Sequence, residues 1–286
     1  AALLALSTRA ACEKTRGSLS HFRSNEFFGI VASGIEILRS HFRQPLNKNK
    51  RQYMKLFSMF IGLFLLAQSA NAATPMGTYY QVNVTNPAAL VAAIDEYSAS
   101  PTGQKNPARV TLFQIISNGA NPATHAISVS YDSAEDMDKS RTLNSGSEDL
   151  AKMQAAMVGV MTPVTESMYR STGISAGSPE AITSSNPISR FILMNVKDPA
   201  KYADAWTKMM TARDSDLPSN ISQIMGAGSG KTSHVVGIYA NNMAELMAGM
   251  DANRDNPAWT EFLASVDGIR TIEEDSIVVR VKSWGS

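Results

Sequence analysis

The sequence predicts an α+β protein built from two tandem βαββαβ repeats. Segments with the alternation typical of strands and segments with the apolar spacing typical of helices follow one another in the same order twice. The run VNVTNPA at 82–88 recurs as MNVKDPA at 194–200, and QIISNGANPATH at 114–125 recurs as QIMGAGSGKTSH at 223–234. Both longer units end on a hydroxyl residue followed by His and then an apolar alternating run, which indicates an internal duplication.

The first repeat begins with a strand rich in β-branched and aromatic residues. Asn86 then caps a helix, and Pro87 fits its first position, where the missing N–H costs nothing. Ser133 resembles the start of a capping box for a second helix, which we expect to break near Asn144 and resume. In chain order, we expect a strand at 78–84, a helix at 88–97, strands at 110–116 and 125–131, an interrupted helix at 133–160, and a strand at 165–170.

The second repeat has the same signals. Asp198 and Asn242 are the expected helix caps, and Asn256 precedes another helix that starts with Pro. The acidic triplet Glu273-Glu274-Asp275 is interpreted as a solvated turn before the last strand. In chain order, we expect a strand at 191–196, a helix at 199–209, strands at 221–225 and 234–239, helices at 243–250 and 257–264, and a strand at 275–282.

The segment before the repeats has a different character. Residues 54–72 read MKLFSMFIGLFLLAQSANA, with a basic start, an apolar stretch and a small-residue cleavage site, as in a secretory signal peptide. A signal peptide should be N-terminal, so we interpret residues 1–53 as a spurious, disordered upstream extension; a transit peptide is the alternative. The remaining expected divisions are a first repeat at 73–172, a linker at 173–189 and a second repeat at 190–286.

Charge and cysteine content narrow the possible functions. Residues 1–72 hold 10 Lys+Arg and 3 Asp+Glu, a net +7, so the stated total of +1 leaves −6 for residues 73–286. An acidic mature chain argues against nucleic-acid binding, which needs clustered Lys and Arg. The one cysteine, Cys12, precedes the signal peptide, which excludes disulfides and cysteine chemistry from the mature chain. We therefore expect a periplasmic or secreted protein that leaves the membrane when the signal is cleaved.

The repeats resemble the ferredoxin-like fold and, more narrowly, the dimeric α+β barrel superfamily, which includes antibiotic-biosynthesis-monooxygenase-like and NIPSNAP-like proteins. The resemblance covers residues 78–285 and rests on element order, on the Asn/Asp-Pro helix starts and on the run NPAWTEFL at 256–263. It implies two sheets packed together as a pseudo-dimeric barrel, either within a monomer or in a homodimer, with ligands between a sheet and its helices. The first repeat has SEDLAKM in place of the NPAWTEFL run, so its pocket is expected to be altered or closed.

Candidate catalytic residues are His125 and His234, at the ends of the duplicated units. Each could act as a general base, bind haem or a metal, or anchor a ligand. The structural alternative is a strand-start His that bonds a neighbouring backbone group and was copied by duplication. No acidic residue stands at a spacing that would orient either imidazole.

Candidate ligand-binding residues are polar or aromatic side chains within apolar segments. Their alternative role is ordinary core packing or a satisfied hydrogen bond within the sheet. These candidates are Tyr80, Asn83, Asn195, Trp206 and Trp259.

Two motifs resemble cofactor sites, a phosphate loop and a copper site, but neither supports a cofactor. The stretch GAGSGKT at 226–232 lacks the first glycine of a phosphate loop, because that position is Met225, and a strand-like run follows it instead of a helix. Methionines at helical spacing, such as Met243, Met247 and Met250, are read as a core stripe instead of a copper site. No cofactor or metal is predicted.

Three functions are consistent with these observations. The first is an exported protein that binds a small, mostly apolar molecule between sheet and helices. The second is a cofactor-free monooxygenase-like or haem-handling enzyme that uses His234 or His125. The third is a non-catalytic module for self-association.

Overall fold

A computed structural model describes residues 74–213, 216–228 and 230–285. The chain divides into two compact units, residues 1–70 and 71–286, and the described residues belong to the second. The predicted signal peptide at 54–72 and the expected extension at 1–53 lie outside the described residues. No helix in the described part of the chain is both long enough and apolar enough to cross a membrane.

Each half of the described chain contains four strands and three α-helices. Short 3-10 turns, η1 (Gly103–Lys105) and η2 (Pro179–Ala181), lie in connections. The first half consists of β1 (Met76–Val84), α4 (Pro87–Ala99), β2 (Arg109–Ser117), β3 (His125–Tyr131), α5 (Ala134–Asn144), α6 (Glu148–Met157) and β4 (Met161–Ala176). The second half consists of β5 (Ile188–Val196), α7 (Pro199–Ala212), β6 (Ser219–Gly226), β7 (His234–Ala240), α8 (Met243–Arg254), α9 (Pro257–Val266) and β8 (Arg270–Trp284).

The helix starts follow the predicted capping chemistry. The Asn86 side chain accepts a hydrogen bond from the N–H of Ala89 at 3.1 Å, and the Asp198 carboxylate accepts one from Lys201 at 3.0 Å. Ser133 caps α5, and Ser147 starts α6 after the predicted break. These bonds satisfy backbone donors that have no partner inside the helix.

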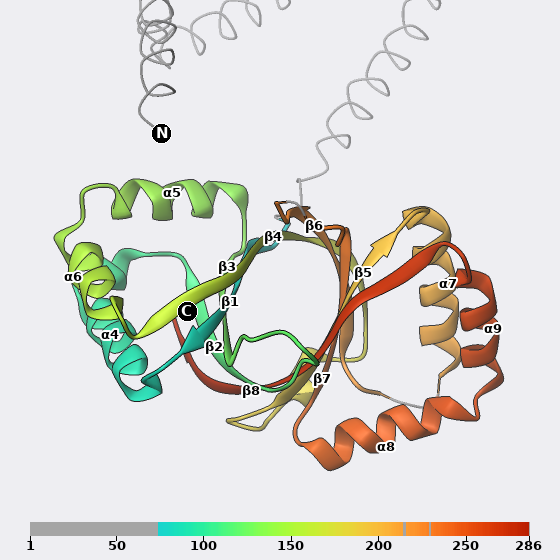
Figure 1. Cartoon of the computed structure of the whole chain (residues 1–286). Coiled ribbons are helices and arrows are strands. Elements are labelled where there is room, and N and C mark those ends of the chain that lie inside the picture. Colours follow the sequence, from blue (N-terminus) through green and yellow to red (C-terminus); the bar gives the residue numbers. More distant parts are fainter. Residues whose placement is uncertain (1–73, 214–215, 229, 286) are drawn as a thin grey trace, which may run out of the picture. The chain divides into compact units, whose positions relative to one another are not determined.

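The eight strands form one closed barrel in the order β1-β3-β2-β8-β5-β7-β6-β4, with β4 returning to β1 (Figure 1). Every pairing is antiparallel, and each half contributes a sheet in the order β4-β1-β3-β2 or β8-β5-β7-β6. The two sheets join edge to edge through β2–β8 and β4–β6. The predicted fold of two tandem ferredoxin-like repeats forming a pseudo-dimeric barrel is confirmed, and closure leaves no free sheet edge.

The last strand of each half is longer than the sequence indicated. We expected 165–170 and 275–282, whereas β4 runs to Ala176 and β8 starts at Arg270. The interpretation of the acidic triplet as a solvated turn is wrong, because Glu274 and Asp275 lie within β8 and pair with β5. The extra length reflects tertiary pairing: these two strands bridge the halves, so each bonds one strand of its own sheet and one of the other.

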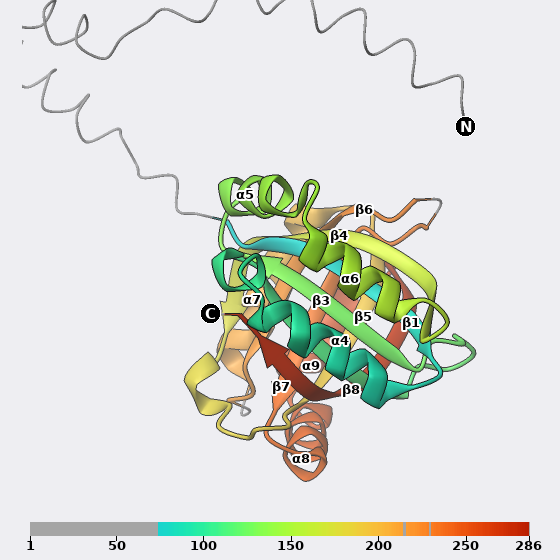
Figure 2. The same ribbon diagram turned by 90° about the vertical axis from the view of Figure 1, so that its left-hand side faces the viewer.

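Successive side chains along each strand point alternately into the barrel lumen and toward one of two helix-covered outer faces. On one outer face, Val82, Leu112 and Ile127 pack under α4 and α6. On the other, Met194, Ile221 and Val236 pack under α7 and α9. The two helix layers lie on opposite sides of the barrel (Figures 1 and 2), so each half has its own core between sheet and helices.

Candidate functional site

The candidate site is a cavity of about 310 Å³ between the second-half sheet and its helices. Its walls come from β5, β6 and β7 on one side and from α7, α8 and α9 on the other. Ligand pockets commonly occupy about 300–1,000 Å³, so this cavity is large enough for a small molecule. The apolar wall residues are Ile192, Met194, Tyr202, Trp206, Met209, Met210, Leu217, Val236, Ile238, Met250, Trp259 and Phe262.

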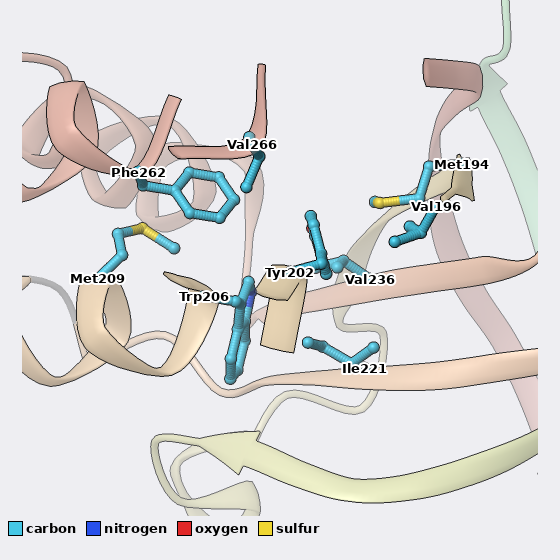
Figure 3. Packing of buried hydrophobic residues seen from close by; sticks show 9 residues of the cluster. All are labelled: Met194, Val196, Tyr202, Trp206, Met209, Ile221, Val236, Phe262 and Val266. Atoms are coloured by element: carbon cyan, nitrogen blue, oxygen red, sulfur yellow. The ribbon is translucent and has the colours of Figure 1, made fainter. Parts of the chain in front are cut away.

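Helix α7 supplies the central part of the wall because its buried face repeats at helical spacing. Tyr202, Trp206 and Met209 lie on this face, and all three are buried. Figure 3 shows Trp206 and Met209 on α7, with Phe262 reaching toward them from α9. The Phe262 ring lies 5.9 Å from the Tyr202 ring and 5.6 Å from the Trp259 ring, measured between centroids. The wall is therefore a connected aromatic surface.

A difference between the halves explains why the cavity lies in the second half. In the first half, Val110 of β2 pairs with Trp284 of β8, and Trp284 is 7% exposed within the core there. The corresponding pair in the second half is Ser219 with Ala176. Two small residues thus occupy the place that an indole and a valine fill in the first half. The Ser219 hydroxyl lines the cavity and has no hydrogen-bond partner there.

This pairing also changes the alignment of the repeats at their ends. The offset of 112 residues between VNVTNPA and MNVKDPA would align Gly173 with Gly285. In the structure, Ala176 pairs with Ser219 in the second half, and Trp284 pairs with Val110 in the first half. By strand register, the counterpart of Trp284 is therefore Ala176. The reason is a larger irregularity in β4, between Ser171 and Ser175, than in β8.

Four arginines line the same cavity, and none of its described wall residues is Asp or Glu. Arg190 donates to both carboxylate oxygens of Asp275, at 2.8 and 2.5 Å, and this carboxylate raises the pKa of Arg190. Arg254 pairs with Asp251 at 2.5 Å and is largely exposed, which places it at the rim. The other two are Arg213 and Arg270.

The two remaining arginines sit in less polar surroundings. Arg213 donates to the carbonyl oxygen of Leu217 at 2.5 Å, and burial lowers its pKa. The Arg270 guanidinium lies over the Phe262 ring, 5.1 Å from its centroid, a distance suited to a cation–π interaction. Burial raises the pKa of Tyr202, and the neighbouring Arg270 charge partly offsets this effect.

The predicted ligand-binding residues divide into two groups. Trp206 and Trp259 face the cavity together. Tyr80 instead packs against the first-half core, Asn83 is exposed, and Asn195 is half-buried; none of the three is in the wall of a described cavity. The sequence did not single out the arginines. A signal was present for Arg190, because the offset of 112 residues between the repeats aligns it with Thr78. Arg270 is aligned with Met161 only by strand register.

The two candidate histidines occupy equivalent positions at the ends of β3 and β7, and each is 7% exposed. The Thr124 hydroxyl accepts from the N–H of Val84 at 2.9 Å and lies 3.0 Å from Nδ1 of His125.

The same arrangement recurs in the second half. The Ser233 hydroxyl accepts from the N–H of Val196 at 2.8 Å and lies 2.9 Å from Nδ1 of His234. A hydroxyl that already accepts from an amide can donate its proton to Nδ1, which leaves the imidazole proton on Nε2. Neither ring lines a described cavity, so a catalytic role stays a prediction.

The geometry does not fit a haem held by His234. This residue pairs with Met194, which is in the cavity wall, but its own ring is engaged by Ser233 outside the wall. Among the described wall residues there is no imidazole to serve as an axial ligand. No group of three or more His, Cys, Asp or Glu in the described part of the chain could hold a metal ion.

A second cavity, of about 200 Å³, lies inside the barrel and differs in character. Tyr79, Tyr169 and Tyr239 line it, together with Phe191 and several hydroxyl residues. Burial raises the pKa of all three phenols, that of Tyr239 to about 12, so they stay neutral.

Next to this lumen, the amide of Gln81 forms a polar network. Its nitrogen donates to Glu274, and its oxygen accepts from Asn121 at 2.8 Å and from Thr165 at 2.7 Å. This network satisfies the Gln81 amide, whereas the buried Tyr79 hydroxyl has no hydrogen-bond partner among the described residues.

Comparison with known proteins supports the fold. The described architecture matches a candidate monooxygenase from Fusobacterium nucleatum, with a TM-score of 0.54 and 8% identity over 76% of this chain and 96% of that chain. A candidate monooxygenase from Lactobacillus acidophilus gives 0.48 and 10% over 74% and 96%. A chlorite dismutase from Candidatus Nitrospira defluvii gives 0.44 and 9% over 73% and 92%.

No protein-family model and no curated protein matches the sequence. The closed barrel and the match to the Fusobacterium protein show that the chain has the dimeric α+β barrel fold, in its tandem form. At such low identity the likeness concerns the fold alone, and any function must be argued from the site.

Proposed function

We propose that this chain binds a small, mostly apolar molecule between the sheet and helices of its second half. The observation that carries this proposal is the cavity of about 310 Å³ beside the Ser219–Ala176 pair, which is the counterpart of the Val110–Trp284 pair in the filled first half. Its aromatic and thioether walls suit an apolar ligand, since burying a methylene group contributes about 0.8 kcal/mol. A ligand of about ten carbons therefore has enough apolar surface for affinity in roughly the micromolar range.

The other functions have less support in this geometry. Catalysis by His234 or His125 would require substrate near an imidazole, and neither imidazole lines a described cavity. Self-association would leave the cavity without a role. We also propose that binding takes place outside the cytoplasm, as a monomer with an internal pseudo-dimer; this rests on the predicted signal peptide at 54–72 and on closure of the barrel within one chain.

The proposal is tested by filling the cavity. The neutral dye N-phenyl-1-naphthylamine fluoresces in apolar surroundings, so a fluorescence titration reports its binding. Ala176 pairs with Ser219 of the cavity wall and packs against the second-half core. Ala176→Trp therefore adds an indole beside the cavity, at the position that Trp284 has in the first half, and we expect at least a tenfold loss of dye affinity, about 1.4 kcal/mol. Val158→Trp is the matched control, because Val158 is 82% exposed and lines no described cavity.

The control variant should bind the dye like the unmodified chain, and both variants should retain the native circular dichroism spectrum. Equal dye affinity in a folded Ala176→Trp variant would show that the dye binds elsewhere. No saturable binding to the unmodified chain would remove the proposal altogether.

A further inference from the structure

We propose that the ligand of this cavity carries an acidic group, a carboxylate in the simplest case, which pairs with Arg270. This inference rests on the proposed function and adds the chemical class of the ligand. It follows from the charges around the cavity, from the surroundings of one guanidinium, and from a comparison of the two halves.

The cavity walls carry positive charge although the expected mature chain is acidic. Among the wall residues that the structure describes, four are arginines and none is Asp or Glu. Asp275 and Asp251 neutralise Arg190 and Arg254 from outside the wall. Arg213 donates a hydrogen bond to the Leu217 carbonyl oxygen and interacts electrostatically with the nearby Asp216.

Arg270 is the exception among the four, because no described carboxylate pairs with it. It is half-buried at the start of β8, next to Val196 of β5, with its guanidinium over Phe262. A charge removed from water needs a partner, and an aromatic face compensates only part of the cost. The Tyr202 hydroxyl also interacts with Arg270, but it carries no charge. A guanidinium offers two parallel N–H donors that match a carboxylate, so an acidic ligand would supply a charged partner.

The first half provides an internal comparison. Arg270 pairs with Val196 in the second half, and Met161 pairs with Val84 at the same place in the first half. Met161 is therefore the counterpart of Arg270. Met161 packs against the filled first-half core. Arg190 likewise corresponds to Thr78, and the helix-end residue Arg213 to Ser100. The half that has the cavity therefore has arginines where the filled half has neutral residues.

The test compares two probes that differ only in their polar end. Decanoate and 1-decanol are titrated as competitors of the bound naphthylamine dye at pH 8, where decanoate is ionised. We expect decanoate to bind the unmodified chain at least about tenfold more tightly than decanol, as befits a charge-assisted hydrogen bond. Arg270→Met, which introduces the first-half residue, should abolish this preference and leave decanol affinity within about twofold.

Two further variants sharpen the comparison. Arg254→Met removes a cavity arginine that already has a carboxylate partner, and it should keep the preference for decanoate. Arg270→Lys should keep part of it, which also provides a test if the Met variant does not fold.

The outcomes separate this inference from the proposed function. Equal affinity for the two probes, or a preference that persists in both Arg270 variants undiminished, would overturn the acidic-ligand inference and leave apolar binding intact. Failure of both probes to displace the dye would overturn the inference and the proposed function together.

Discussion

At the scale of single residues, the repeated hydroxyl–His pair has a structural explanation. Thr124 and Ser233 each connect a backbone N–H of the neighbouring strand to an imidazole nitrogen. This bond joins the end of β3 to β1, and the end of β7 to β5, on the helix-facing side. A duplication that preserved the core would preserve this bond as well, which accounts for the identical spacing of the two units.

These histidines predict how stability depends on pH. Burial lowers the pKa of His125 and His234 below the ordinary value of 6.5, so the unfolded chain binds protons more readily than the folded chain. The stability conferred by neutral imidazoles is present above about pH 6.5 and is lost as the pH falls toward the folded pKa. We expect the urea midpoint to decrease from pH 7.5 to pH 5.5.

The double substitution His125→Gln with His234→Gln should make this pH dependence shallower, since glutamine cannot take up the proton. A slope unchanged from that of the unmodified chain would show that other groups cause the acid sensitivity.

The ligand-binding role of the candidate residues stays a prediction, but their burial shows which positions the sequence could indicate. Trp206 and Trp259 are at helical spacing on apolar faces, and both line the cavity. Asn83 and Asn195 were singled out as polar residues in apolar strands, but a strand end can be exposed without disturbing the core. Arg270 was missed because an arginine at the start of a strand is unremarkable until its missing carboxylate partner is known.

At the scale of elements, β4 and β8 determine the difference between the halves. Their order and approximate positions were predictable from alternation and turn residues. Their full lengths were not, because the extra residues pair with a strand of the other half that is distant in sequence. Because of the irregularity in β4, Ala176 takes the position in the second half that Trp284 of β8 has in the first half. A constant offset between the repeats in the sequence does not show this correspondence.

This account predicts a large effect of removing Trp284. Its indole N–H donates to Asp95 at 2.6 Å, and the ring packs in the first-half core. Trp284→Ala should lower the free energy of unfolding by about 3–5 kcal/mol, because it leaves a cavity in the first-half core. Asp95 keeps its ion pair with Lys282 in this variant, so the loss reports mainly the missing indole packing. Urea unfolding measures this loss.

Trp259→Ala is the matched comparison, because Trp259 is half-buried and already borders a cavity. It should cost clearly less than Trp284→Ala. Equal losses would contradict the view that one half is filled and the other is not.

At the scale of the whole molecule, duplication has given one barrel with two unlike halves. Both halves keep side-chain caps at the corresponding helix starts, a hydroxyl–His pair at the same strand position and the same strand order. One half has a core closed by Trp284, and the other has a cavity with aromatic walls and an unmatched arginine. The first half is thus the structural support, and the second half is the proposed site of binding.

The most direct test of this central claim is a crystal structure of the chain grown with decanoate. We predict one decanoate per chain, with its alkyl chain between Trp206 and Trp259 and its carboxylate on Arg270. Decanoate bound instead under α4 and α6 or inside the barrel, with the second-half cavity empty, would contradict the account.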